Sequence, residues 1–268
     1  MMSKKITIAG LGWLGKPLAS TLKLYGYSVK GSVTDAVKAK EITKSGITCY
    51  PLVISEDSVS GMVTTFLSDT EVLIIMIPPG LRRNTGANYA LKMAVFLNEI
   101  ENAGIPNVIL VSSTSVYADD QGQVSEHIVP MPDTDAGRQL YEVEQLFFNS
   151  PSFECTIVRF GGLYGGSRNP VKFLAGRKNL SNGEAPVNLI HRQDCIGILM
   201  EILKRDAFGH IFNCVHPMHP SKKEYYTNKA KELGLEPPEY QAESKEVFKQ
   251  VESNLVRKVL NYHFRDTF

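Results

Sequence analysis

Short apolar segments rich in β-branched residues alternate with segments of helical periodicity along the first 160 residues. The short segments are bounded by glycine, proline or polar residues, which is typical of strands. In the longer segments apolar residues recur at spacings of three and four, which is typical of amphipathic helices. The predicted strands are 5–10, 27–33, 47–52, 71–78, 107–114 and 155–160, and the predicted helices are 16–25, 36–45, 57–67, 87–103 and 137–149.

This alternation predicts a parallel sheet with helices on both of its faces. The segment 71–78, "EVLIIMIP", is nearly all apolar, as expected of a strand that is covered on both sides. We therefore predict an α/β fold with a doubly wound parallel sheet, in which residues 1–160 form the core.

After residue 160 the chain becomes glycine-rich and irregular, beginning with "GGLYGGSRNP". Further elements are then predicted: strands at 185–191 and 210–216, and helices at 193–205, near 221–234 and near 244–260. We predict that residues 161–268 form a small C-terminal substrate lobe, interleaved with the last sheet elements. Such a lobe would cover the carboxyl ends of the strands, where open α/β sheets bind their ligands.

The charge balance favours a small-molecule partner. Lysine plus arginine number 29 and aspartate plus glutamate number 28, so no net field attracts nucleic acid or an anionic membrane. The four cysteines form no CxxC pair, and we predict no metal site. No apolar run approaches the roughly 20 residues that a membrane span needs, and we expect a cytoplasmic protein.

A glycine motif, "GLGWLG", directly follows the first predicted strand and opens the first predicted helix. In the G-x-G-x-x-G pattern, Gly10 allows a tight turn, Gly12 lets a pyrophosphate approach the backbone, and Gly15 lets helix and strand pack closely. The phosphates would lie at the positive end of the helix, against backbone N–H groups that include those of Trp13 and Leu14. The motif therefore predicts a dinucleotide site, and the alternative is a compact turn without a ligand.

The second predicted strand bears on the choice between NAD and NADP. NAD-selective sites usually place a carboxylate at the end of this strand, but here it ends "KGSVTD", with Ser32 and Thr34 in that region. Small hydroxyl residues accommodate a 2′-phosphate, which slightly favours NADP. Asp35 keeps NAD open, and Ser32 and Thr34 are equally well explained as plain loop residues.

Five stretches in order carry a family resemblance: "GLGWLG", "MIPPG", "VSSTSVYADDQG", "VRFGGLYG" and "VNLIHRQDCIGIL". Together they resemble the extended and atypical branch of the short-chain dehydrogenase/reductase superfamily, the NAD-dependent epimerase/dehydratase-like proteins, to about residue 216. The spelling of the glycine motif is similar to that of the YeeZ-like group. The resemblance implies an NAD(P)-binding Rossmann fold, a homodimer as a common assembly, and a cofactor loop at Ile77, Pro78 and Pro79.

The same resemblance implies the substrate side of the site. Ser113 corresponds to the catalytic residue that hydrogen-bonds a substrate oxygen, with Thr114 and Tyr117 beside the substrate, although hydroxyls at a strand end also satisfy backbone groups. The late motif brings Asn188, His191 and Arg192 to the substrate cleft. Arg82, in the loop after "MIPPG", is suited to clamp a phosphate or carboxylate, or is a solvated loop charge.

The helix predicted at 137–149 lacks the family's reactive pair. Aligning "AGRQLYEVE" with the Y-G-x-S-K-x-x-x-E motif places Ala136 at the position of the general acid/base tyrosine and Leu140 at that of the lysine. Tyr141 lies one position further, about 100° around a helix. Two hypotheses follow: an oxidoreductase, epimerase or dehydratase that uses another acid/base on a small polar, sugar-nucleotide-like substrate, or a catalytically silent NAD(P)(H) sensor or regulatory protein.

Overall fold

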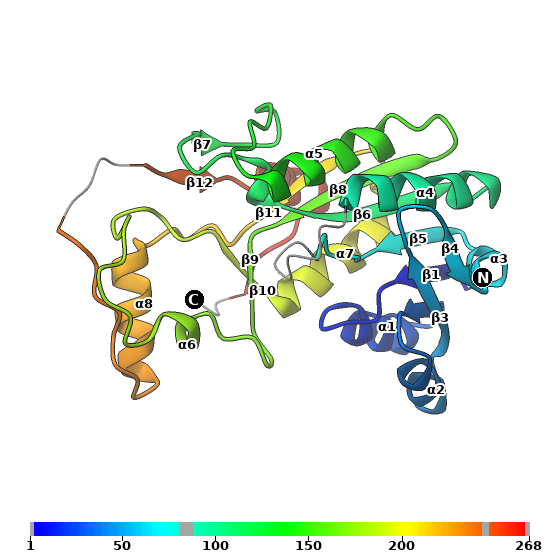
Figure 1. Cartoon of the computed structure of the whole chain (residues 1–268), viewed down its shortest axis with the longest axis horizontal. Helices are drawn as coiled ribbons and strands as arrows, with labels where there is room; N and C mark the ends of the chain where they lie inside the picture. Colours follow the sequence, from blue (N-terminus) through cyan, green and yellow to red (C-terminus); the bar gives the residue numbers. More distant parts are fainter. Residues whose placement is uncertain (1–2, 81–87, 243–246, 266–268) are drawn as a thin grey trace.

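A central sheet of eight strands organises the computed structural model, which describes residues 3–80, 88–242 and 247–265. The strand order is β11-β8-β6-β5-β1-β2-β3-β4, and every neighbouring pair is parallel except β3 with β4 (Figure 1). The strands are β1 (Lys5–Ala9), β2 (Ser28–Val33), β3 (Thr48–Ile54), β4 (Val59–Gly61), β5 (Val72–Ile75), β6 (Asn107–Ser113), β8 (Glu154–Phe160) and β11 (Ile211–Cys214).

The order of the strands confirms the predicted doubly wound α/β fold. The chain starts at β1 in the middle, proceeds outward through β2 and β3, and then returns to β5 on the other side of β1 before continuing outward through β6, β8 and β11. This reversal beside β1 creates the crevice at which open parallel sheets bind ligands.

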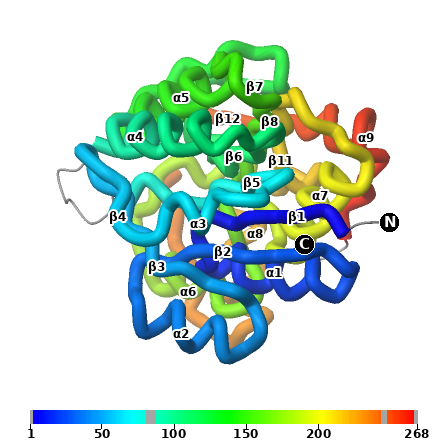
Figure 2. The backbone as a smooth tube through the Cα atoms, turned by 90° about the vertical axis from the view of Figure 1, so that its right-hand side faces the viewer, coloured from blue at the N-terminus to red at the C-terminus, as the bar shows by residue number. Residues whose placement is uncertain are grey.

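Helices cover both faces of the sheet, as Figure 2 shows from the side. Val72 and Ile74 of β5 pack into one core cluster, whereas Leu73 and Ile75 pack into the other, as the period of a strand requires. One cluster includes residues of α1 (Gly15–Leu24), α2 (Ala36–Lys44), α7 (Arg192–Arg205) and α9 (Asn254–Leu260). The opposite cluster includes residues of α3 (Val63–Leu67), α4 (Tyr89–Asn102) and α5 (Asp135–Phe148).

The chain beyond β8 forms smaller units and also rejoins the main sheet through β11. Two small parallel pairs are present, β9 (Gly162–Tyr164) with β10 (Leu189–His191) and β7 (Gly122–Val124) with β12 (Lys249–Val251). The helices α6 (Val171–Leu174) and α8 (Lys222–Glu232) lie to the left of the sheet in Figure 1. Within the described ranges, no helix combines the length and apolarity needed to cross a lipid bilayer.

The helix predicted at 57–67 is wrong in its first half. Residues Val59–Gly61 form the edge strand β4, which pairs antiparallel with Leu52–Ile54, and only Val63–Leu67 is helical. Gly61 has a φ of 113°, and a Cβ there would lie 2.4 Å from the carbonyl oxygen of Pro51. The close approach of two backbones at a glycine therefore overrides the local helical spacing.

The helix predicted near 244–260 is also replaced in part. The structure describes this segment from residue 247, where Lys249–Val251 forms β12 and the helix α9 begins only at Asn254. Pairing with β7 keeps this stretch extended. Since β7 is 125 residues away along the chain (249 minus 124), the periodicity of the segment itself contains no sign of this pairing.

Candidate functional site

The candidate site lies along one edge of the sheet, where three neighbouring parallel strands end. Residues 10–15, which we call the glycine loop, follow Ala9 of β1, and the segment from Ile77 follows β5. Ala9 is in register with Ile75, and Ile75 is in register with Leu110 of β6, three residues before Ser113. The predicted cofactor and catalytic segments therefore meet at the carboxyl edge of the sheet.

The backbone of the loop has the tight turn at Gly10 and the close packing at Gly15 that the motif predicts. Gly10 has a φ of 108°, and a Cβ at this position would lie 2.9 Å from the carbonyl oxygen of Met76. A Cβ at Gly15 would lie 2.2 Å from the carbonyl oxygen of Gly10, so the start of α1 packs directly on the loop. At Gly12, by contrast, a Cβ would have no described atom within 4 Å, which leaves open space beside the backbone.

The glycine loop also presents unused hydrogen-bond donors. Leu11 N–H donates to Ser32 O at 2.7 Å and Gly12 N–H to Gly10 O at 2.9 Å, which fixes the first half of the loop. In the described part of the chain, the backbone N–H groups of Trp13 and Leu14 have no acceptor, and Trp13 Nε1 is buried without a partner. Free N–H groups at a helix N-terminus suit an anion, so this loop fits the pyrophosphate of a dinucleotide.

The residues after β2 differ in exposure. Ser32 is buried, whereas Thr34 and Asp35 are exposed. Asp35 is the N-cap of α2, and its carboxylate accepts a hydrogen bond from Lys38 N–H at 2.7 Å. One oxygen of the exposed carboxylate is therefore bound to the backbone of α2, and the other has no hydrogen-bond donor among the described residues.

The segment after β5 is described only as far as residue 80. The carbonyl of Ile77 accepts a hydrogen bond from the Tyr89 hydroxyl at 3.0 Å, while Pro78 is exposed and Pro79 is half-buried. Arg82 lies outside the described residues, and its predicted role stays a prediction.

A pocket of about 270 Å³ lies at the end of β6. Three of the predicted substrate-side residues line it: Ser113, Thr114 and Asn188. Ser113 is half-buried and caps the short 3-10 helix η2 (Thr114–Val116), where its hydroxyl accepts from Ser115 N–H at 3.2 Å. Because this bond uses a lone pair, the hydroxyl proton of Ser113 remains available to a substrate oxygen.

Asn188 lines the pocket and also holds its wall in place. The side-chain amide donates to Lys249 O at 2.6 Å and accepts from Val251 N–H at 2.9 Å. Both donor and acceptor are thus bound to β12. Asn188 therefore positions the wall of the pocket through one N–H and one lone pair of its amide, and its predicted contact with a substrate stays a prediction.

Two pocket residues were missed by the sequence analysis. Lys222 and Tyr226 lie four positions apart on α8 and both line the pocket with Ser113. Their i, i+4 spacing places them on one face of the helix. The sequence contains this spacing, but nothing in it places α8 opposite the end of β6.

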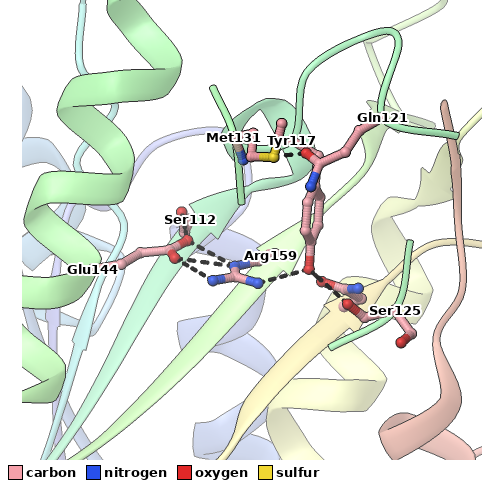
Figure 3. A network of polar contacts seen from close by, with 8 residues as sticks. Ser112, Tyr117, Gln121, Ser125, Met131, Glu144 and Arg159 are labelled. Carbon is pink, nitrogen blue, oxygen red and sulfur yellow. Dashed lines mark hydrogen bonds and ion pairs between the residues drawn. The ribbon is translucent and has the colours of Figure 1, made fainter. Parts of the chain in front are cut away.

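Tyr117 does not lie in the pocket but in the core (Figure 3). Its hydroxyl accepts from Arg159 Nη1 at 2.7 Å and lies 3.1 Å from both Ser125 O and Asn213 Oδ1. Burial raises the pKa of Tyr117, with Arg159 and Asn213 opposing the shift. The phenol is buried and occupied by these partners, so the structure gives the predicted substrate residue a structural role instead.

His191 and Arg192 begin α7 and stay outside the pocket. His191 is the N-cap, and its Nδ1 accepts from Gln193 N–H at 3.3 Å. Burial lowers the pKa of His191, Asp194 opposes the shift, and Arg192 lowers it further. The Arg192 guanidinium lies over the ring of Trp13, with Cζ 5.2 Å from the ring centroid. Arg192 is thus on the glycine-loop side rather than in the pocket.

On α5, the two positions that align with the family's tyrosine and lysine, Ala136 and Leu140, have different environments. Leu140 is 7% exposed and packs in the core with Val143, whereas Ala136 is half-buried. Tyr141, one position after the lysine site, is half-buried and packs against the same core cluster.

Comparisons with known proteins agree with this geometry. No protein-family model matches the chain. Protein YeeZ of Escherichia coli strain K12 is 38% identical over 244 residues, covering 88% of this chain and 86% of YeeZ.

Solved structures share the fold at low sequence identity. A UDP-glucose 4-epimerase of Thermotoga maritima with UDP-glucose has a TM-score of 0.79 at 16% identity, covering 97% of this chain and 94% of that chain. MoeE5 in complex with UDP-glucuronic acid and NAD has a TM-score of 0.77 at 19% identity, covering 97% of this chain and 94% of that chain. A short-chain dehydrogenase/reductase superfamily protein of Agrobacterium tumefaciens with bound NAD has a TM-score of 0.77 at 16% identity, covering 98% and 93%.

The strand order, the geometry of the glycine loop and these similarities lead to one conclusion. The chain has the Rossmann fold of short-chain dehydrogenase/reductase and epimerase proteins, and it belongs to the YeeZ family.

Proposed function

We propose that this chain binds NAD(P) in the glycine loop and acts as an oxidoreductase, epimerase or dehydratase on a small polar substrate of the sugar-nucleotide kind. The observation that carries this proposal is the glycine loop itself. Two N–H groups without an acceptor in the described chain, Trp13 and Leu14, lie at the N-terminus of α1, next to the open space at Gly12. The NAD complexes of MoeE5 and the Agrobacterium tumefaciens protein support this choice of cofactor.

The second half of the proposal concerns the pocket at the end of β6. A bound nicotinamide supplies redox chemistry, and the Ser113 hydroxyl donates a hydrogen bond to a substrate oxygen. Lys222 has no ion-pair partner among the described residues and presents a positive charge to an anionic substrate. Burial raises the pKa of Tyr226, so its phenol stays protonated at neutral pH and acts as a hydrogen-bond donor.

NADP is the proposed preference. β2 itself ends without an acidic residue, and Asp35, two positions further, caps α2 through one of its carboxylate oxygens. Ser32 and Thr34 precede Asp35 in the chain, and small hydroxyl residues in this region are compatible with a 2′-phosphate.

Replacing Ser113 by alanine tests the proposed reaction. With purified protein, NADPH or NADH and a panel of sugar nucleotides, we expect the variant to lower kcat about 100-fold, because it removes a donor to a developing negative charge. Ser60→Ala on the exposed edge strand β4 is the matched control and should leave kcat unchanged. Turnover that survives in Ser113→Ala would exclude the proposed role of this hydroxyl.

A catalytically silent sensor is the second candidate function. Ala136 and Leu140, at the family positions of the tyrosine and lysine, favour it because neither side chain titrates. For a sensor, we expect saturable cofactor binding and no consumption of NAD(P)H with any sugar nucleotide of the panel. Turnover that is lost in Ser113→Ala would contradict the sensor.

A further inference from the structure

Two arginines from distant parts of the chain converge on Trp13 of the glycine loop. The Cζ of Arg168 lies 4.7 Å from the centroid of the indole ring, and that of Arg192 lies 5.2 Å from it. Neither arginine lines the pocket at the end of β6. The predicted C-terminal lobe thus reaches the candidate cofactor loop with two positive charges.

A tight turn after β9 positions Arg168 next to Trp13. β9 and β10 pair in parallel and end at Tyr164 and His191, directly before the two segments that bear the arginines. Gly165 and Arg168 exchange two backbone hydrogen bonds, of 2.9 and 3.1 Å, which close a tight turn.

Gly166 in this turn adopts a backbone conformation that favours glycine and lies against Arg192. Gly166 has a φ of 56°, and a Cβ there would lie 2.5 Å from Arg192 Cζ. A side chain at residue 166 would displace the guanidinium. The turn at residues 165–168 therefore packs against Arg192, the first residue of α7.

Neither guanidinium group has an anionic partner within the described part of the chain. Among the described residues, neither Arg168 nor Arg192 forms an ion pair, whereas Arg205 at the other end of α7 is paired with Glu201 at 3.0 Å. The buried Asp194 near Arg192 accepts instead from the Tyr262 hydroxyl and from Arg265 N–H. A guanidinium has five N–H donors, so contact with an aromatic ring leaves donors for an anion.

The ring that carries both arginines belongs to a residue with an unused backbone donor. Trp13 N–H and Leu14 N–H have no acceptor in the described chain, and both guanidinium groups contact the side chain of Trp13 itself. Backbone donors at a helix N-terminus and guanidinium forks both match phosphate oxygens. We propose that Arg168 and Arg192 clamp the pyrophosphate of the dinucleotide in the glycine loop, with the indole of Trp13 as the platform that orients them.

This inference rests on the proposed cofactor function and adds residues outside the glycine motif to the cofactor site. It also gives the lobe a direct role in holding the cofactor. Because the two arginines bring positive charge to the phosphates, we expect the affinity for the dinucleotide to fall as ionic strength rises.

The test is equilibrium binding of NADH, NADPH and ADP-ribose, measured by calorimetry at low ionic strength. The variants are Arg168→Gln, Arg192→Gln and the double variant, with Arg205→Gln as a control that removes the same charge from the same protein. We expect each single variant to raise Kd about 10-fold and the double variant about 100-fold, since each loses charge-assisted hydrogen bonds. Arg205→Gln should leave Kd unchanged, and Tm should stay close to that of the wild type in all variants.

The three ligands separate the outcomes. An equal loss of affinity for NADH and ADP-ribose supports the clamp, because both contain the pyrophosphate. A loss confined to NADH, with ADP-ribose binding intact, would overturn it and place the arginines at the nicotinamide or substrate end. Unchanged Kd values in the double variant would also overturn the clamp while leaving the cofactor function in place. If the wild type bound none of the three ligands, the proposed function would fail and the clamp with it.

Discussion

Replacing Arg159 by leucine is expected to lower the free energy of unfolding by about 3–5 kcal/mol, because it leaves a buried carboxylate without its counter-charge. Arg159 and Glu144 are each 1% exposed, and Nη2 of the arginine lies 2.6 Å from Oε2 of the glutamate. Ser112 adds a hydrogen bond to the same carboxylate at 2.6 Å (Figure 3). The measurement is urea unfolding of both proteins, followed by circular dichroism.

Two further variants make this test specific. Arg138→Leu removes an arginine from an exposed pair with Asp135 and should change stability by less than about 1 kcal/mol. The double variant Arg159→Leu/Glu144→Leu should recover much of the loss, since removing both charges leaves none unpaired. A loss below about 1 kcal/mol for Arg159→Leu alone would contradict the role given to this ion pair.

Alanine at Gly12 and at Gly15 is expected to weaken cofactor binding strongly, for two different reasons. At Gly15 the new Cβ would lie 2.2 Å from the carbonyl oxygen of Gly10, so the loop or the start of α1 must move. We expect a loss of about 1–3 kcal/mol in stability from this overpacking. At Gly12 the Cβ meets no described atom within 4 Å, so the fold should keep its stability while the methyl group occupies the approach of the pyrophosphate.

Binding and stability are therefore measured together on both variants. Losing the alignment of two hydrogen bonds to a charged group, each worth about 1.5–3 kcal/mol, should raise the Kd for NADPH at least about 100-fold. Gly104→Ala, in the loop after α4, is a control for binding: its φ of 65° costs an alanine about 1–2 kcal/mol in stability, but the residue lies outside the glycine loop and should leave Kd unchanged. Wild-type affinity in Gly12→Ala would show that the loop does not hold the pyrophosphate as proposed.

The sequence was sufficient for the parallel strands of the main sheet, although not for the antiparallel edge strand β4, because the parallel strands depend on local patterns. β5 is apolar on both faces, and its alternate residues do pack into the two cores on opposite sides of the sheet. The glycine loop was predictable for a similar reason. The positive φ of Gly10 and the close packing at Gly15 are features of the local backbone that only glycine allows, so the sequence itself marks them.

Long-range contacts explain what the sequence analysis missed. β12 stays extended because β7 and the amide of Asn188 bind its backbone, and neither is close to it in the sequence. Tyr117 resembled a substrate residue by its motif, but Arg159, 42 positions away, binds its hydroxyl in the core.

The C-terminal contributions to the site were the hardest to predict. Arg168 lies in an irregular glycine-rich stretch without periodicity, so nothing local connects it to Trp13. Lys222 and Tyr226 have the spacing of one helix face, but only the fold brings that face to Ser113. Ser113 itself was identified by its family motif, and the pocket is consistent with that role.

The measurement that tests the central claim most directly is a titration of the purified protein with NADPH and, separately, NADH. Binding is followed by calorimetry and by the fluorescence of Trp13, the single tryptophan, which lies within the glycine loop. The proposed cofactor site predicts saturable binding at micromolar concentration with one cofactor per chain, a change in Trp13 emission, and tighter binding of NADPH. An absence of both heat and fluorescence change with either cofactor would contradict dinucleotide binding in this loop.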